Sequence, residues 1–292
     1  MKIIGRRNER KELEDCERSE KSELVCVYGR RRVGKTFLVE QTFAGSFAFR
    51  ATGVESGNTR QQLKSFHQRL KEHGDETRTI PKDWFEAFSR LDHVLSKKDV
   101  NLSPNNKKIV FLDEFDKKVM PSYTSKGDNV NQNVQNQILT LVEGRVVEEK
   151  EKKINTENTL FIACGAFNEC RKEKGVITKH VGFERTTEYG SDHYTPITKQ
   201  DMIELGASYE LLGRFPLLVN FQKLSEEAVD LVIDKSLKNL RKDLGIYVNV
   251  AHEYRKKLHM QANTEYGCRQ LVASLTETVM PAFVLALKKG KL

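Results

Sequence analysis

The sequence predicts an α/β protein, a three-layer sandwich in which helices cover both faces of a mostly parallel sheet, followed by a smaller helical lid. Short apolar runs alternate with segments of helical periodicity over residues 1–200, the pattern of parallel sheets with helical crossovers. A glycine-rich loop leads from the first apolar run into a helical segment, and a later apolar run ends in two acids. We expect the α/β domain at residues 1–200 and the lid at residues 222–292.

The first elements are recognised by apolar runs or by apolar residues three or four positions apart. A charged segment over residues 8–21 has Leu13 as almost its only apolar residue, and it is interpreted as an exposed helix rich in opposite charges. The elements that follow are a strand over 24–28, a helix over 35–42, a strand over 45–53, a helix over 59–73 and a helix that begins at Pro81.

The next part of the chain supplies the remaining predicted strands. Residues 109–112 and 159–163 are apolar runs that predict buried strands, and residues 217–221 predict a short one. Between them we expect a polar loop over 119–133, a helix that stops at Gly144, a charged hairpin or excursion over 145–158, an irregular excursion over 165–197 and helical structure from Thr198. Helices over 225–243, 247–260 and 265–288 complete the lid, with Ser225 as a plausible N-cap.

The loop after the first strand has the sequence GRRRVGKT, in the spacing G-x-x-x-x-G-K-[ST]. Its glycines let the backbone curl so that successive N–H groups point inward at phosphate oxygens. The lysine would reach the β- and γ-phosphates, the threonine hydroxyl would bind Mg²⁺, and the following helix adds its positive dipole end. A chance match in a basic loop is the alternative, which the strand before and the helix after the motif make less frequent. The predicted nucleotide-binding residues are Gly29, Arg30, Val33, Gly34, Lys35, Thr36 and Phe37.

The strand over 109–112 ends in Asp113 and Glu114. Carboxylates at the carboxyl end of a buried strand lie beside the ligand site in open α/β sheets. We predict that Asp113 holds Mg²⁺ and that Glu114 polarises the attacking water, with Lys35 as the third catalytic group. The alternative, a strand that simply ends in solvated acids, is common, and the phosphate loop upstream favours the catalytic interpretation.

Composition limits the classes of protein that the chain can belong to. The net charge of +8 permits contact with nucleic acid, but Lys and Arg are interleaved with Asp and Glu, which favours a mixed solvated surface. Five cysteines are scattered singly, so neither zinc nor a disulfide framework is expected. No run of about 18 apolar residues is evident, so no membrane span is expected. The N-terminus lacks the apolar core of a signal peptide, and we expect a cytoplasmic protein.

Two resemblances follow from the motifs. GRRRVGKT, PKDWFEAFSRLD and the opening Ile3-Ile4-Gly5-Arg6 resemble bacterial and archaeal ATPases near the STAND group. From Val110 onward, FLDEFDK, QNQILTLVEG, NTLFIACGAF, DMIELGASYELLGRFP, LSEEAVDLVI and YGCRQL are similar, in this order, to the ClpX/HslU branch of AAA+ unfoldases. The chain therefore resembles a hybrid whose parts join at the acidic strand. The resemblance implies a P-loop ATPase of the AAA+ type that uses ATP and Mg²⁺.

The resemblance also implies further site residues. Arg214 in ELLGRFP matches the arginine finger that reaches a neighbour's γ-phosphate, which implies a homo-oligomeric ring. Arg269 in YGCRQL matches the sensor arginine that ties the lid to the nucleotide, and Cys164 or Asn168 lies near the other sensor position. Ile4 and its neighbours are expected near the adenine. A surface or helix-capping role is the alternative for each arginine.

Three functions stay open at this point. The first is an ATPase that couples hydrolysis to remodelling a macromolecule, most directly a protein. The second is a STAND-like nucleotide switch with slow hydrolysis. Residues 51–58 favour this second function, because they lack the aromatic residue that unfoldases carry in their pore loop. The third is nucleic-acid binding, suggested only by the net charge.

Overall fold

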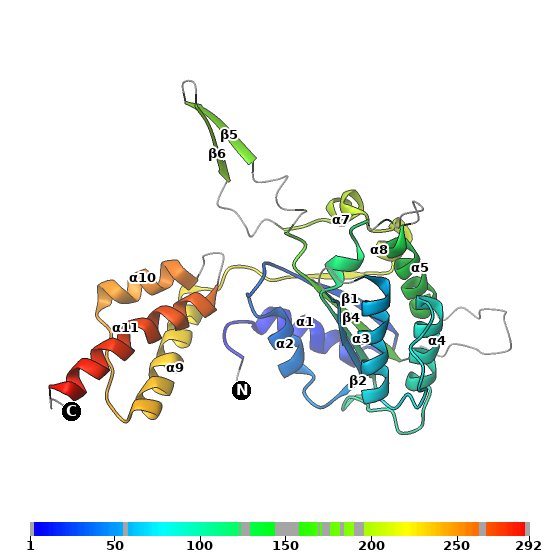
Figure 1. Ribbon diagram of the computed structural model, residues 1–292, viewed down its shortest axis with the longest axis horizontal. Coiled ribbons are helices and arrows are strands. Elements are labelled where there is room, and N and C mark those ends of the chain that lie inside the picture. Colours follow the sequence, from blue (N-terminus) through cyan, green and yellow to red (C-terminus); the bar gives the residue numbers. More distant parts are fainter. Residues whose placement is uncertain are drawn as a thin grey trace. The chain divides into compact units, whose positions relative to one another are not determined.

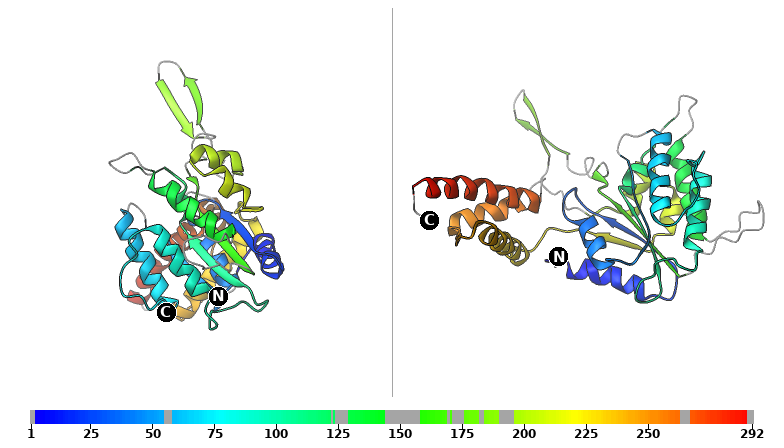
Figure 2. Two further views of the ribbon diagram at one scale, coloured as in Figure 1. Left: turned by 90° about the vertical axis from the view of Figure 1, so that its right-hand side faces the viewer. Right: turned by 60° about the horizontal axis from the view of Figure 1, so that its bottom comes forward.

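The computed structural model describes residues 3–54, 58–121, 123, 129–143, 158–168, 170, 176–181, 184–189, 196–262 and 267–289. These residues form two compact units (Figures 1 and 2). The larger unit comprises Glu9–Gly29 and Lys35–Phe221, and the smaller one comprises Met1–Asn8, Arg30–Gly34 and Gln222–Leu292.

The larger unit is built on a five-stranded sheet with the strand order β2-β3-β4-β1-β7. Every neighbouring pair is parallel, which confirms the predicted α/β class. The strands are β1 (Glu23–Tyr28), β2 (Phe47–Thr52), β3 (Lys108–Asp113), β4 (Thr159–Gly165) and β7 (Leu217–Asn220). β4 lies between β1, which precedes the glycine-rich loop, and β3, the acidic strand that ends in Asp113.

Helices lie on both faces of this sheet. Figures 1 and 2 show α3, α4 and α5 on one face and α1 and α2 on the other. The helices of this unit are α1 (Arg7–Arg18), α2 (Lys35–Thr42), α3 (Thr59–Glu72), α4 (Trp84–Leu95), the 3₁₀ turn η1 (Phe115–Lys118), α5 (Val130–Glu143), α7 (Lys199–Leu205) and α8 (Tyr209–Gly213). The predicted three layers are therefore present.

The core of the larger unit follows from strand alternation. Leu24, Cys26 and Tyr28 of β1 belong to one buried cluster with the apolar faces of α3, α4 and α5. Val25 and Val27 lie between them in the sequence, are equally buried and do not belong to that cluster. Successive side chains of a strand point to opposite faces, so this apolar run is buried from both sides, as parallel sheets require.

Two predicted boundaries are wrong by about a turn. α4 begins at Trp84 and not at Pro81, because the Asp83 side chain caps it by accepting a hydrogen bond from the Glu86 amide at 2.8 Å. α5 begins at Val130, inside the segment predicted as a polar loop over 119–133. Residues 122 and 124–128 of that loop, Gly144, and residues 145–157 of the predicted charged excursion lie outside the described residues.

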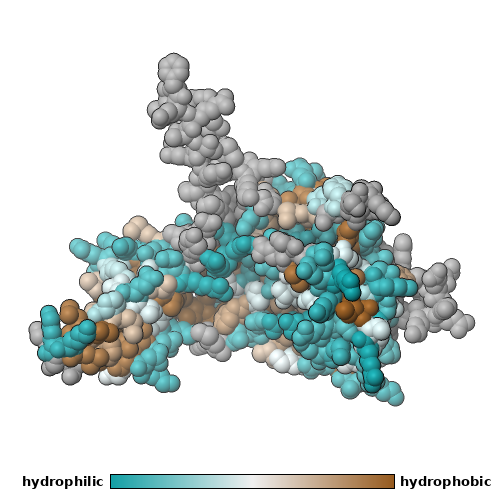
Figure 3. Space-filling model, viewed as in Figure 1, coloured by the Kyte–Doolittle hydropathy of each residue, from teal (hydrophilic) through white to brown (hydrophobic). Residues whose placement is uncertain are grey.

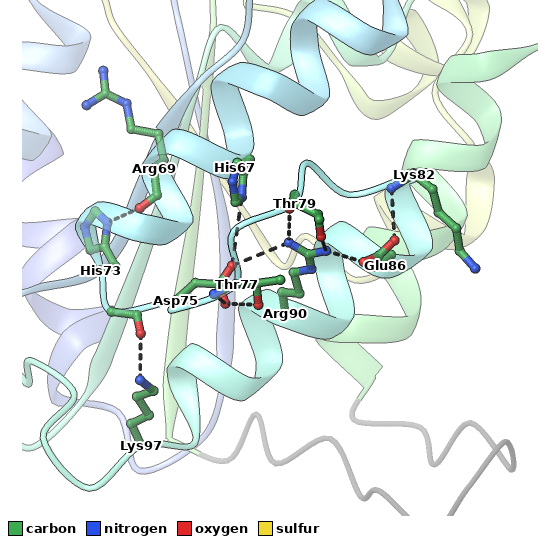
Figure 4. A network of polar contacts seen from close by, with 11 residues as sticks. His67, Arg69, His73, Asp75, Thr77, Thr79, Lys82, Glu86, Arg90 and Lys97 are labelled. Atoms are coloured by element: carbon green, nitrogen blue, oxygen red, sulfur yellow. Dashed lines mark hydrogen bonds and ion pairs between the residues drawn. The ribbon is translucent and has the colours of Figure 1, made fainter.

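A polar network fixes the segment between α3 and α4 (Figure 4). The Asp75 carboxylate accepts hydrogen bonds from the amide and the hydroxyl of Thr77, at 3.2 and 2.7 Å. The Arg90 guanidinium on α4 donates to the Thr79 carbonyl at 2.6 Å and pairs with Glu86 and Asp75. The network ties the connecting segment to α4, and through it the two helices that lie over β2 are held together.

The predicted irregular excursion over 165–197 contains a hairpin, so that prediction is wrong in part. β5 (Val176–Val181) and β6 (Glu184–Tyr189) pair antiparallel, from Val176↔Tyr189 to Val181↔Glu184. Thr and charged residues are frequent in both strands, so no apolar run marks them. The β-branched residues that favour strands are nevertheless present, in VIT and TT.

The smaller unit is helical, with α9 (Glu226–Leu244), α10 (His252–Ala262) and α11 (Cys268–Lys288). Ser225 caps α9 as predicted, because its hydroxyl accepts a hydrogen bond from the Ala228 amide at 3.2 Å. α10 begins five residues after the predicted start at 247. The core is made of apolar residues from all three helices, namely Val229, Ile233, Leu237, Leu258, Leu271 and Leu275.

The outer part of α11 is apolar. Figure 3 shows hydrophobic residues gathered toward its C-terminal end, where Met280, Val284, Leu285 and Leu287 are exposed. With 21 residues and a mean hydropathy of 1.5 over its best window, of which 11% is buried, α11 is long and apolar enough to cross a membrane. A single helix of this kind is weak support for a membrane span. In the sequence, Arg269 and Glu277 interrupt the apolar residues of this helix, which is why no span is predicted there.

Candidate functional site

The glycine-rich loop leaves the carboxyl end of β1 at Gly29. A methyl group on Gly29 would lie 2.5 Å from the Phe221 Cβ, so only glycine allows the strand end to pack against the residue that follows β7. Further along, Arg32 and Gly34 have φ values of 66° and 93°, in the left-handed region. A Cβ on Gly34 would meet no atom within 4 Å, so the glycine there serves backbone conformation and not packing. The loop therefore has the curled backbone that the sequence predicts.

Lys35 is the first residue of α2 and is buried, at 8% exposure. Its Nζ donates to the Gly29 carbonyl oxygen at 2.8 Å, which folds the side chain back over the loop. Burial lowers the pKa of Lys35, while the nearby acids Asp113, Asp116 and Glu114 act in the opposite direction. The Lys35 ammonium therefore lies close enough to the acids after β3 to interact with their charges.

Thr36 and Asp113 meet directly. The Thr36 hydroxyl donates to Asp113 Oδ2 at 2.9 Å, although 77 residues separate the two in the chain. A hydroxyl and a carboxylate are hard oxygen ligands of the kind that Mg²⁺ prefers, and two ligands at right angles in an octahedral site are about 2.9 Å apart. These two residues consequently fit a shared magnesium ion. The Asp113 carbonyl accepts from the Gly53 amide at 2.9 Å, which fixes the strand end against β2.

Glu114 follows Asp113 in an unusual backbone conformation. Its φ of 55° and ψ of 37° lie in the left-handed region, which costs a residue with a Cβ about 1 kcal/mol or more. Its amide donates to Asp113 Oδ1 at 3.0 Å. This residue turns the chain from β3 into η1. Strain of this kind is typical of functional sites.

The end of β4 lies between the loop and the acidic strand, as its place in the sheet requires. Burial, followed by the charge of Asp113 and a hydrogen bond with it, raises the pKa of the Cys164 thiol, so this cysteine is a neutral neighbour of both Asp113 and Lys35. Asn168, the other sensor candidate, is half-buried a few residues after the strand. The structure thus brings Cys164 into the site.

A tight seam joins η1 to the end of β4. A methyl group on Gly165 would lie 2.7 Å from the Phe167 ring and 3.0 Å from both the Cβ and the amide nitrogen of Asp116. Asp116 is buried, and its Oδ2 accepts from the Phe167 amide at 3.3 Å. Sequence analysis did not single out Asp116. The sequence signal for Asp116 is that it is the third acid within four residues, more than a strand that simply ends in solvent needs.

Gln135 on α5 connects η1 to the turn between α7 and α8. Its side chain is fully buried, with 0% exposure. Nε2 donates to the carbonyls of Lys118, Val119 and Gly206 at 3.2–3.3 Å, and Oε1 accepts from the Ser208 amide at 2.7 Å. We call this arrangement the Gln135 clamp. No sequence signal identifies it, because its partners are main-chain groups.

Arg214 lies away from the other candidates. It is exposed at the end of α8, three residues before β7. β7 runs parallel to β1, with Val25 opposite Leu217 and Tyr28 opposite Asn220. Arg214 therefore lies at the amino-terminal edge of the sheet, opposite the edge where β1 enters the glycine-rich loop. The structure does not bring this arginine to Lys35 and Asp113 within one chain.

Phe37 is half-buried on α2 of the larger unit, and the other remaining candidates belong to the smaller unit. Arg30 is buried and Val33 half-buried. A methyl group on Gly267 would lie 3.0 Å from the Arg32 carbonyl oxygen, so the start of α11 packs against the loop, and Arg269 is exposed two residues later. Ile4 is half-buried next to Gly5, where a methyl group would lie 2.4 Å from the Ala228 Cβ.

Comparisons with known proteins agree with this geometry. The family model described as "AAA domain (Cdc48 subfamily)" matches residues 25–218 and therefore extends across β3, the strand at which the two sequence resemblances meet. The chain is similar to the ATP-dependent protease ATPase subunit HslU of Staphylococcus carnosus, with 28% identity over 190 residues, 61% of this chain and 40% of the relative.

It is also similar to the ATP-dependent Clp protease ATP-binding subunit ClpX of Bacteroides fragilis, with 28% identity over 224 residues, 66% of this chain and 52% of the relative. A match to HslU of Staphylococcus aureus is 34% identical over 119 residues, 41% of this chain and 19% of the relative. The chain therefore spans about half or less of the length of these curated relatives. Because the family model covers most of the chain, the protein belongs to the AAA domain (Cdc48 subfamily) family of P-loop ATPases.

Proposed function

We propose that this protein hydrolyses ATP in a Mg²⁺-dependent reaction and couples hydrolysis to the remodelling of a protein substrate. The observation that carries the proposal is the hydrogen bond between Thr36 and Asp113 at 2.9 Å, beside the buried Lys35 and the strained Glu114. When bound between Thr36 and Asp113, Mg²⁺ would supply charge neutralisation at the transferring phosphoryl group.

The roles of the protein groups follow from their positions. Backbone N–H groups of the loop and the start of α2 would hold the phosphates, and Lys35 would add a positive charge at the γ-phosphate. Glu114 would orient the attacking water and accept its proton, since its carboxylate follows directly on the metal-binding acid. Cys164 and Asn168 remain the candidates for the sensor at the end of β4.

The catalytic proposal is tested with Lys35→Ala and Glu114→Gln. Lys35→Ala should abolish binding of a fluorescent ATP analogue, and Glu114→Gln should keep binding but lower turnover by at least about a hundredfold. Glu210→Gln, on the exposed first turn of α8, is the matched control and should leave both unchanged. Turnover of Glu114→Gln at the parent rate would remove the assignment of the base.

We propose in addition that Arg214 acts in a neighbouring subunit of a homo-oligomer. The support is its place at the opposite edge of the sheet from the chain's own Lys35. Arg214→Ala should be inactive alone, and so should Lys35→Ala. A mixture of the two should regain activity, because a Lys35→Ala subunit still offers Arg214 to an intact neighbouring site. No recovery in mixtures that light scattering shows to be assembled would refute the role in trans.

The kind of substrate is proposed from the relatives, whose names describe ATPase subunits of ATP-dependent proteases. Turnover should rise when an unfolded protein such as casein is added, and it should not respond to DNA at moderate salt. The alternative is a nucleotide-dependent switch, favoured by the absence of an aromatic residue at positions 51–58. Tight nucleotide retention with no stimulation by protein would favour the switch. Cytoplasmic residence stays a prediction.

A further inference from the structure

The larger unit contains a pocket beside the proposed ATPase site, with which it shares Asp113 as a lining residue. It lies at the carboxyl ends of β2 and β3 and is closed by α3, α4, η1 and α5. The empty space between its walls is about 530 Å³ when the open mouth is included. The carboxyl edge of a parallel sheet is also the place where α/β proteins bind ligands.

The inner wall of the pocket is aromatic. Phe66, Trp84 and Phe88 all line it and are at most 9% exposed. The ring centroids of Phe66 lie 5.5 Å from those of both Trp84 and Phe88, and the Trp84–Phe88 distance is 5.7 Å. Tilted and edge-on rings present both faces and edges to the space beside them, an arrangement that suits a further aromatic ring.

A buried cation also lines the pocket. Lys118 of η1 is 7% exposed; its Nζ lies 5.7 Å from the centre of the Trp84 ring and donates to the side-chain oxygen of Gln62. Within the described part of the chain no carboxylate forms an ion pair with it. Burial alone lowers the pKa of Lys118 to about 8. An ammonium has three hydrogens, so two remain for a ligand.

A second polar group lacks a partner in the same wall. The Trp84 Nε1–H is buried and forms no hydrogen bond with any residue that the structure describes. Buried donors without a partner are rare in proteins, and each calls for an explanation. A ligand with a hydrogen-bond acceptor would explain both the Trp84 N–H and the remaining hydrogens of the Lys118 ammonium.

We propose that this pocket binds a small aromatic monocarboxylate, with the ring against Phe66, Trp84 and Phe88 and the carboxylate paired with Lys118. A single buried ammonium balances one negative charge. A phosphate dianion would leave a second charge to be desolvated in an apolar wall, which is strongly unfavourable. The charged side chains that also line the pocket are Arg69 and Asp113, and Arg69 pairs with Glu72 at 2.7 Å.

The proposal is tested with a fluorinated probe and its neutral counterpart, in the absence of nucleotide. Fluorine NMR titrations compare 4-(trifluoromethyl)phenylacetate with 4-(trifluoromethyl)phenylacetamide on the full chain. We expect a Kd of about 0.1–1 mM for the acid, the range for a ligand of this size. The amide should bind at least about tenfold more weakly, because it cannot form the charge-assisted pair.

Two variants separate the parts of the site. Lys118→Met removes the charge at similar length, and it should weaken the acid at least about tenfold while leaving the amide within about twofold. Ser65→Phe places a ring in the half-buried mouth and should abolish binding of both probes. Acid affinity that is unchanged in Lys118→Met, or no saturable binding of the acid to the wild type at millimolar concentration, would overturn the proposal.

A pH titration of the wild type tests the same pairing and does not depend on whether the variants fold. Affinity for the acid should fall as pH rises from 7 to 9.5, because Lys118 loses its proton over this range. Affinity for the amide should stay constant. The other charged side chains that line the pocket, Asp113 and Arg69, face both probes, so the neutral amide serves as the control for their influence. An acid affinity independent of pH would contradict the pairing with Lys118. All these measurements are made without ATP, so they stand or fall independently of the ATPase proposal.

Discussion

Replacing Gln135 by methionine tests whether the Gln135 clamp holds the larger unit together. Methionine has a similar length and is well tolerated in a core, so the variant removes hydrogen bonds with little change in volume. The amide NH₂ has two hydrogens for its three carbonyl partners, and its oxygen accepts a third bond from Ser208. Three hydrogen bonds at about 1 kcal/mol each, with their partners left buried and unpaired, give a loss of about 3 kcal/mol.

In a unit of this size a loss of 1 kcal/mol lowers the melting temperature by about 2–4 °C, so Gln135→Met should melt about 6–12 °C lower. The assay is thermal unfolding followed by circular dichroism, supported by urea midpoints at 25 °C. The matched control is Gln132→Met, one turn earlier on α5, where the half-buried side chain has a single hydrogen bond within the described residues, to Asn136 at 3.2 Å. It should cost about 0.5 kcal/mol or less. Equal melting temperatures for the two variants would refute the reasoning.

Three further predictions concern the site and its neighbourhood. Gly29→Ala places a methyl group 2.5 Å from the Phe221 Cβ, and it should both destabilise the larger unit and weaken ATP binding, measured by melting and by titration. Thr36→Val removes the hydroxyl that contacts the acidic strand, so ATP should bind equally well with and without Mg²⁺ in this variant, measured by calorimetry. Lys118→Met should be more stable than the wild type at pH 7, and this advantage should shrink as pH rises from 8 to 10, measured by urea unfolding, with Lys64→Met on the exposed side of α3 as the control.

The sign of the last prediction follows from proton binding. The folded pKa of Lys118 lies below its unfolded value, so between the two the unfolded chain binds more protons and stability rises with pH. A constant difference between wild type and Lys118→Met over this range would contradict it. A Gly29→Ala protein with unchanged melting would show that the contact with Phe221 relaxes, and an effect of Mg²⁺ on Thr36→Val would place the metal elsewhere.

Local signals in the sequence predict the part of the site that local structure builds. An apolar run, a glycine-rich loop and a helix follow one another without interruption from Leu24 to Thr42, so strand, loop and helix could be predicted together with Lys35. The acidic strand could be predicted because its apolar run ends abruptly in Asp113. Both segments depend on residues that are neighbours in the chain.

The rest depends on contacts between distant segments. Gln135 and Lys118 look like ordinary polar residues of helical segments, and only packing shows that one clamps main-chain carbonyls and the other lies buried against an indole ring. The start of α4 shifted because a capping side chain outweighed the preference of Pro81 for a helix start. The hairpin of β5 and β6 was missed because its polar strands lack the apolar alternation that marks a half-buried strand.

The seam at Gly165 has a consequence for how turnover can be controlled. Well-packed interfaces shift between discrete arrangements and do not deform by degrees. There is no space for one more carbon atom between Asp116 and the end of β4. The turn from Asp113 to Asp116 therefore has little freedom to move away from a bound triphosphate and back. We therefore expect Asp113 and Glu114 to stay in one arrangement throughout turnover. The rate of hydrolysis would then be controlled by a partner that binds the chain, such as another copy that contributes Arg214.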